Sequence, residues 1–133
     1  MLFFVSVALI SATILSFTGC GKYEDGPSLS LKTKKGRITN QWKLTAELYN
    51  GTPQSLISNE VIDIKKDDTF VITWGSSSET GTWAFSSDKE SVTFTPNNSS
   101  SANTYKILRL KSNELWLQEI YGSSTYEYHY DKE

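Results

Sequence analysis

Cysteine and histidine are scarce in this sequence, with one of each among 133 residues. One cysteine cannot form a disulfide within the chain. One cysteine and one histidine together cannot supply the ligands of a Cys/His zinc site. Basic charge is not in excess, because 13 Lys and Arg stand against 15 Asp and Glu. The resulting net charge of −2 argues against a nucleic-acid-binding protein. Aromatic residues are not scarce, at 13%, and they can supply a folded core, which argues against disorder.

Residues 1–19 contain no charged side chain. This apolar stretch is short for a transmembrane helix, which needs about 20 apolar residues, and it ends in small residues as export signals do. The tetrapeptide Phe17-Thr18-Gly19-Cys20 resembles the lipobox of bacterial lipoproteins. The resemblance implies a lipoprotein signal peptide over residues 1–19 and lipid attachment at Cys20, which would anchor the protein to a membrane. An uncleaved N-terminal anchor and a plain secretory signal are the alternatives.

A polar segment follows the cysteine. Residues 20–36 include the breaker pair Gly26-Pro27 and predict a flexible tether. A short amphipathic helix could form towards the end of this region, with Ile38 on its apolar face. We therefore expect the folded domain to occupy residues 37–133.

From residue 41 onward, apolar and polar residues alternate with a period close to two, which predicts β-strands. Asn50-Gly51 is a strong turn signal, residues 75–78 are expected to form a loop, and two hairpins are expected around residues 65–68 and 111–113. The predicted strands cover residues 42–48, 61–64, 69–74, 81–85, 91–95, 105–110, 114–121 and 125–131.

The spacing of these strands defines the fold class. No helical pattern separates them, so a parallel sheet with crossover helices is unfavourable. Closely spaced turn signals favour a sandwich or barrel, and sequential hairpins favour an up-and-down meander whose edges are removed by closure. The sequence predicts an all-β, antiparallel up-and-down barrel of seven to eight strands.

The order of elements resembles a known family. The lipobox, the polar leader, and residues 40–44, 66–70, 81–85 and 107–117 are together similar to the lipocalin-like lipoproteins of Bacteroidota. This largely uncharacterised family implies a lipocalin-like barrel anchored in the cell envelope, at the outer membrane, on either its periplasmic or its surface face. In lipocalins an Arg from a late strand packs over the first-strand Trp. The resemblance therefore implies a barrel-closing stack of Arg109 on Trp42.

The barrel interior is expected to be aromatic. A core filled by such side chains and a cavity that holds a small apolar ligand both remain open. A filled core favours an interaction module for an envelope protein or a glycan. A cavity favours a carrier or sensor of a small ligand. The predicted inward or ligand-lining residues are Trp42, Phe70, Ile72, Trp74, Trp83, Phe85 and Phe94, with Trp74 at the mouth.

Catalytic signals are weak. His129 lies two residues from Glu127 on one strand face, a pairing that a surface position explains as well as acid–base chemistry does. Asp67 and Asp68 fall in a predicted turn, where aspartate is common. No nucleophile elbow, phosphate loop or calcium loop is present, so we expect neither an enzyme nor a bound cofactor or metal.

Overall fold

The computed structural model describes residues 32–99 and 101–133. The predicted signal peptide, the lipid attachment site at Cys20 and most of the predicted tether lie outside these residues. The described residues form one short helix, α1 (Lys34–Ile38), and a nine-stranded sheet. The strands are β1 (Gln41–Tyr49), β2 (Thr52–Pro53), β3 (Glu60–Ile64), β4 (Thr69–Trp74), β5 (Ser77–Phe85), β6 (Ser91–Pro96), β7 (Asn103–Leu110), β8 (Glu114–Tyr121) and β9 (Ser124–Lys132).

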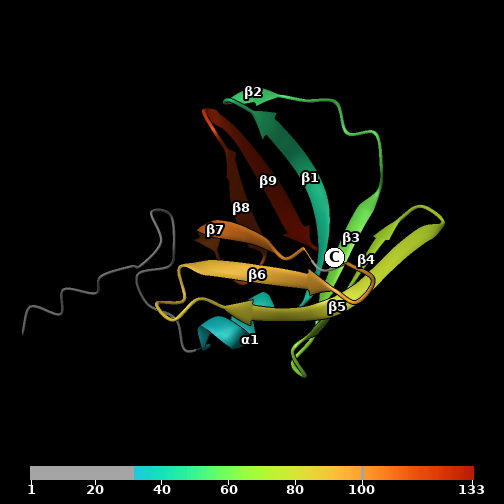
Figure 1. Cartoon of the computed structure of the whole chain (residues 1–133), viewed down its shortest axis with the longest axis vertical. Coiled ribbons are helices and arrows are strands. Elements are labelled where there is room, and N and C mark those ends of the chain that lie inside the picture. The colour runs from blue at the N-terminus through green and yellow to red at the C-terminus, as the bar shows by residue number, and fades with distance from the viewer. Residues whose placement is uncertain (1–31, 100) are drawn as a thin grey trace, which may run out of the picture.

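The sheet closes on itself. Strands β3 to β9 follow one another in chain order, and β1 pairs with both β3 and β9, always antiparallel. Of the strands described, β1 and β3 to β9 form the barrel, and the short β2 adds to the edge of β1. The prediction of an antiparallel up-and-down barrel is confirmed (Figure 1).

The predicted turns lie where the sequence placed them, with one difference. Asn50 and Gly51 have φ values of 47° and 82°, the left-handed conformation that suits a tight hairpin turn. The two predicted hairpins are β3–β4 and β7–β8. The expected loop at residues 75–78 is shorter than predicted, because β5 already begins at Ser77 and pairs there with Trp74.

Two irregularities change which residues face inward. The register shifts between Leu44 and Ala46 on β1, and between Ile107 and Arg109 on β7. A bulge of this kind turns every later side chain on the strand to the opposite face. On β1 it brings Glu47 to the inner face, where Glu47 pairs with Tyr128 of β9.

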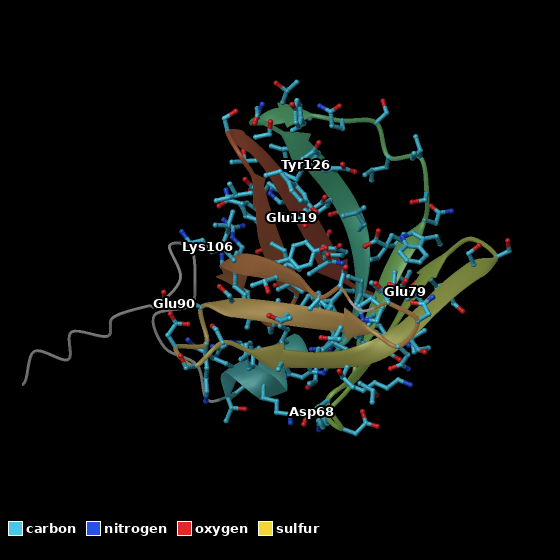
Figure 2. All side chains as sticks on the ribbon, in the orientation of Figure 1. Asp68, Glu79, Glu90, Lys106, Glu119 and Tyr126 are labelled. Carbon is cyan, nitrogen blue, oxygen red and sulfur yellow. The ribbon has the colours of Figure 1, made fainter. Side chains whose placement is uncertain are left out.

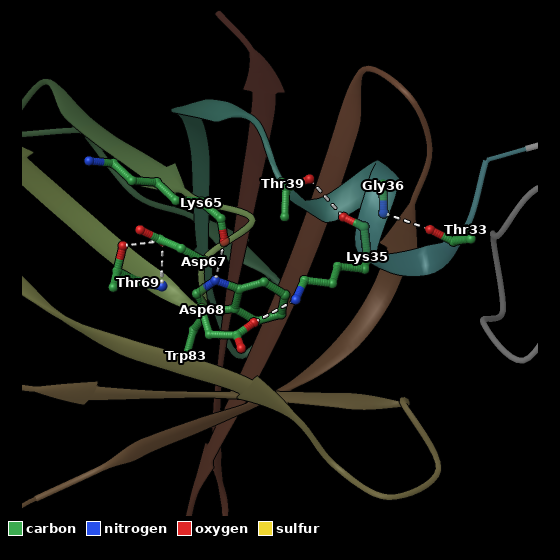
Figure 3. Close-up of polar contacts among 9 residues, drawn as sticks. All are labelled: Thr33, Lys35, Gly36, Thr39, Lys65, Asp67, Asp68, Thr69 and Trp83. Carbon is green, nitrogen blue, oxygen red and sulfur yellow. Dashed lines mark hydrogen bonds and ion pairs between the residues drawn. The ribbon is translucent and has the colours of Figure 1, made fainter.

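Helix α1 covers one end of the barrel, and its first residue lies three positions before the predicted domain boundary at residue 37. Ile38 is fully buried, and its carbonyl oxygen accepts a hydrogen bond of 2.8 Å from Trp42 Nε1. Figure 3 shows the polar contacts of α1 and of the neighbouring turn between β3 and β4. Lys35 Nζ lies 2.7 Å from Asp68 Oδ1, and Trp83 Nε1 donates a 2.8 Å hydrogen bond to the Lys65 carbonyl oxygen.

The core at this closed end is filled by buried side chains. Apolar side chains there are 0–4% exposed, and the two buried indole N–H groups both have partners, as burial of tryptophan requires. Each fully buried aliphatic or aromatic side chain contributes about 1.5–3 kcal/mol to stability. The members near α1 are Ile38, Trp42, Trp83, Leu110 and Leu115.

In the part of the chain that the structure describes, no helix has the length and hydrophobicity needed to span a membrane.

Candidate functional site

The other end of the barrel is hollow. A cavity of about 160 Å³ lies inside the barrel, lined by residues from each of the strands β3 to β9. It lies towards the end of the barrel that is farther from α1. It is lined by Glu60, Ile62, Phe70, Ile72, Trp74, Glu79, Phe94, Pro96, Asn103, Tyr105, Leu117, Tyr128 and Tyr130. The interior is therefore filled near α1, and the cavity at the other end can admit a small molecule.

Four of the predicted interior residues line this cavity. They are Phe70, Ile72, Trp74 and Phe94. The other three predicted residues are not among those that line it. Trp42 and Trp83 are buried in the filled part near α1, and Phe85 packs against the same core with its ring centroid 5.3 Å from that of Trp83.

The floor of the cavity depends on a glycine. A Cβ atom on Gly81 would come within 2.7 Å of Phe70 Cε1 and 2.8 Å of Pro96 Cα, and it would collide with the Thr95 carbonyl oxygen. These distances are too short for any side chain. The absence of a side chain at residue 81 therefore lets the Phe70 ring lie across β5, and Phe70 meets Phe94 edge to face at 5.1 Å.

Glu60 is the most constrained polar residue of the wall. Its Oε1 accepts a 2.7 Å hydrogen bond from Tyr130 Oη, and its Oε2 accepts a 2.9 Å hydrogen bond from Trp74 Nε1. Tyr130 is only 4% exposed. Burial, reinforced by the charge of Glu60 and by this hydrogen bond, raises the pKa of the Tyr130 phenol well above its ordinary value. Tyr130 therefore stays protonated and fixes the orientation of the carboxylate.

Two further tyrosines, one from β7 and one from β9, line the cavity. The rings of Tyr105 and Tyr128 meet edge to face, with centroids 6.1 Å apart. Burial raises the pKa of both phenols, and the charges of Glu119 and Glu60 raise it further. Both groups remain neutral hydroxyls that can donate or accept hydrogen bonds.

Acidic and aromatic residues continue from the cavity along the inner face of β1, β8 and β9, which rise above β6 and β7 (Figure 1). Glu119 pairs with Tyr126, and both side chains are seen on this upper sheet in Figure 2. The Tyr126 ring lies 5.0 Å from that of Tyr49 and 6.1 Å from that of Tyr121.

The expected stack of Arg109 on Trp42 is replaced by a different one. The Arg109 guanidinium carbon lies 3.5 Å from the centroid of the Trp116 ring, and Trp116 stacks on His129 with centroids 3.7 Å apart. The β7 bulge is the reason. Strict alternation would place Arg109 inside with Ile107, but the shifted register pairs Arg109 with Trp116.

The remaining candidates for chemistry lie away from the cavity. His129 Nε2 is 2.6 Å from Glu127 Oε1, on the face of β9 opposite to Tyr128 and Tyr130. Asp67 Oδ1 accepts hydrogen bonds from both the amide and the hydroxyl of Thr69, which lower the pKa of the exposed Asp67 carboxyl (Figure 3). The geometry assigns Asp67 to the turn.

The two acidic residues of the cavity, Glu60 and Glu79, are not among the predicted site residues. Glu60 is in phase with the buried Ile62 and Ile64, and Glu79 is in phase with Gly81 and Trp83. A carboxylate in phase with core residues at a strand end is unusual, because strand alternation then directs its charge inward. That pattern could have identified both residues.

Within the described residues, no group of three or more His, Cys, Asp or Glu side chains is placed to hold a metal ion. A scan against protein-family models and a search of curated proteins both find no match to this chain.

Proposed function

We propose that this protein is a lipid-anchored protein of a bacterial cell envelope whose barrel binds one small organic ligand non-covalently. The cavity of about 160 Å³ is the observation that supports this best. An engineered apolar cavity of about 150 Å³ holds one benzene molecule, whereas pockets for drug-sized ligands occupy about 300–1,000 Å³. The ligand is therefore about the size of one ring.

The character of the lining refines the expected apolar ligand. The floor is apolar, with Phe70, Phe94 and Leu117 all 1–3% exposed. Glu60 and Glu79 add carboxylates to the wall. A suitable ligand places an apolar body against the floor and a polar group towards the carboxylates.

The anchor and the binding site belong to separate parts of the chain. Cys20 precedes the first described helix, which starts at Lys34, so the proposed acylation site is separate in the chain from the residues that line the cavity. Two or more acyl chains hold a protein stably at a membrane, and the barrel then needs no membrane-binding surface of its own. We propose a binding role without catalysis, at the outer membrane of an envelope like that of Bacteroidota.

Native mass spectrometry tests the binding role. The full chain in mild detergent would be incubated with the small-molecule fraction of a bacterial envelope extract. Two matched variants on β4 give the control. Ile72→Phe projects a ring into the cavity, whereas Val71→Phe adds the same group to the neighbouring residue, on the opposite face of the strand.

The wild-type protein and Val71→Phe should each retain one bound molecule, and Ile72→Phe should retain none. Absence of any bound molecule from the wild type, or its survival in Ile72→Phe, would contradict a ligand in the cavity.

One observation favours the alternative of an interaction module. Ile57 is 99% exposed, and Ile120 and Tyr121 are each 60% exposed, all near the hollow end of the barrel. Exposed apolar groups of this kind suit contact with an envelope protein or a glycan. Such a partner should bind equally to wild type and Ile72→Phe, and it should be lost in Ile57→Ser.

A further inference from the structure

We propose that the ligand of this cavity is a small organic cation, such as an amine carried on a single ring or a compact quaternary ammonium group. This inference rests on the proposed function, that the barrel binds one small ligand. It follows from the charge of the wall, the partners of Glu60 and the arrangement of the aromatic rings.

The wall of the cavity carries charge of one sign. Its described lining residues include Glu60 and Glu79, and they include no Lys, Arg or His. Two more carboxylates extend the same inner face, since Glu47 pairs with Tyr128 and Glu119 pairs with Tyr126. A concave surface lined by one sign of charge attracts ligands of the opposite sign and repels those of its own.

The charge of Glu60 is oriented by its neighbours but not neutralised by them. Both of its hydrogen-bond donors, the phenol of Tyr130 and the indole of Trp74, are uncharged. A carboxylate has about four acceptor positions, so Glu60 can accept further hydrogen bonds after these two. Glu79 has no hydrogen-bond or ion-pair partner among the described residues and lies half-buried in the same wall. An ammonium group supplies the counter-charge that these residues lack.

The aromatic residues suit a cation as well. Tyr105 lies between Phe94 and Tyr128, with ring centroids at 6.0 Å and 6.1 Å and interplanar angles of 65° and 83°. Inclined rings present a ring face on one side and a ring edge on another, and electron-rich ring faces attract ammonium groups. Trp74 adds an indole to the same wall. Aromatic rings combined with carboxylates are the environment in which proteins bind amines and quaternary ammonium groups.

The tyrosines lie where the charges of these carboxylates act together. After burial, the charges of Glu119, Glu47 and Glu60 all raise the pKa of the Tyr128 phenol. Three carboxylates on different strands therefore act on one point of the wall. A positive group placed beside Tyr128 experiences the same three charges with favourable sign.

Three probes of equal size and different charge test the proposal. Benzylamine is a cation at neutral pH, benzyl alcohol is neutral and benzoate is an anion. Each would be titrated into the full chain by calorimetry at one fixed ionic strength. We expect benzylamine to bind about tenfold more tightly than benzyl alcohol, and benzoate to show no binding, because an ammonium adds a charge-assisted hydrogen bond and cation–π attraction.

A matched pair of charge-removing variants locates the effect. Glu79→Gln removes one charge from the wall while keeping the shape of the side chain. Glu90→Gln makes the same change in the β5–β6 turn, at the end of these strands away from the cavity (Figure 2). Glu79→Gln should weaken benzylamine by about three- to tenfold and leave benzyl alcohol unchanged. Glu90→Gln should alter neither.

The outcomes separate this inference from the proposed function. If benzyl alcohol or benzoate binds as tightly as benzylamine, and Ile72→Phe abolishes that binding, the cavity holds a ligand but the cation inference is wrong. An equal effect of Glu79→Gln and Glu90→Gln on benzylamine also overturns it, because the attraction would then be non-specific. If none of the three probes binds, both the inference and the ring-sized site fail.

Discussion

The hydrogen bond between Tyr130 and Glu60 links the core to the cavity wall, and its removal has a definite predicted cost. Tyr130→Phe deletes the hydroxyl that donates to Glu60 Oε1 over 2.7 Å and leaves the buried ring in place. Hydrogen bonds to charged groups contribute about 1.5–3 kcal/mol. We therefore expect Tyr130→Phe to lower the free energy of unfolding by about 1.5–3 kcal/mol.

The neighbouring tyrosine gives the control. Tyr128 lines the same cavity two residues earlier on β9, and its hydroxyl has no hydrogen-bond partner among the residues described. Tyr128→Phe should cost less than about 0.5 kcal/mol, because it removes no hydrogen bond. Urea unfolding at neutral pH measures both variants, and equal slopes would show that both unfold from similarly compact states.

A double-mutant cycle makes the prediction stricter. In a Glu60→Gln background the acceptor charge is gone, so Tyr130→Phe should cost at least about 1 kcal/mol less than it does in the wild type. If the two single tyrosine variants lose the same stability, or if Tyr130→Phe costs the same in both backgrounds, the interpretation of Glu60 as a carboxylate held by Tyr130 is refuted.

Four further predictions concern the core, the cavity floor, the anchor and the phenols. Trp42→Ala should cost about 3–5 kcal/mol in urea unfolding because Trp42 is fully buried; a loss below about 1 kcal/mol would contradict its place in the core. Gly81→Ala should cost about 1–3 kcal/mol, since its Cβ would collide with the Thr95 carbonyl oxygen, and an unchanged urea midpoint would count against that packing. Cys20→Ser should abolish acyl labelling and leave an uncleaved precursor, and persistent labelling would exclude a lipoprotein modified at this residue. The cavity phenols keep their protons above the ordinary tyrosine pKa of 10.0, so their contribution to the free energy of unfolding should be fully present below that pH and should be lost as the pH rises beyond it. Equal urea midpoints at about pH 8 and about pH 11 would contradict the raised pKa values.

The architecture could be predicted because it depends on local signals. Period-two alternation shows where a half-buried strand lies, and turn residues such as Asn50-Gly51 show where it ends. Hairpins joined in series then leave few topologies open, and closure of the sheet removes its two edges. The strand β5 begins at Ser77, four residues before the predicted start at Gly81, because the turn that precedes it is shorter than expected.

The inner face around the site was harder to predict because two bulges change which side chains of β1 and β7 point inward. On β1, strict alternation places Leu44, Ala46 and Leu48 on one face, but the shift after Leu44 turns Ala46 outward and Glu47 inward. On β7 the same effect moves Arg109 from the interior to the Trp116 surface. A bulge inserts one residue without a distinctive sequence, so its position follows from the pairing of whole strands.

The bulge on β1 also adds to the charge of the inner face. Without the shift on β7, Arg109 would face inward beside Ile107, at a level of the barrel away from Asn103 and Tyr105, the β7 residues that line the cavity. Without the shift on β1, Glu47 would face outward, and its charge would no longer act on the Tyr128 phenol. The bulge on β1 therefore adds a negative charge to the inner face that continues from the cavity. A cavity whose wall carries Glu60 and Glu79, with Glu47 on the adjoining inner face, is suited to a ligand that carries a positive charge.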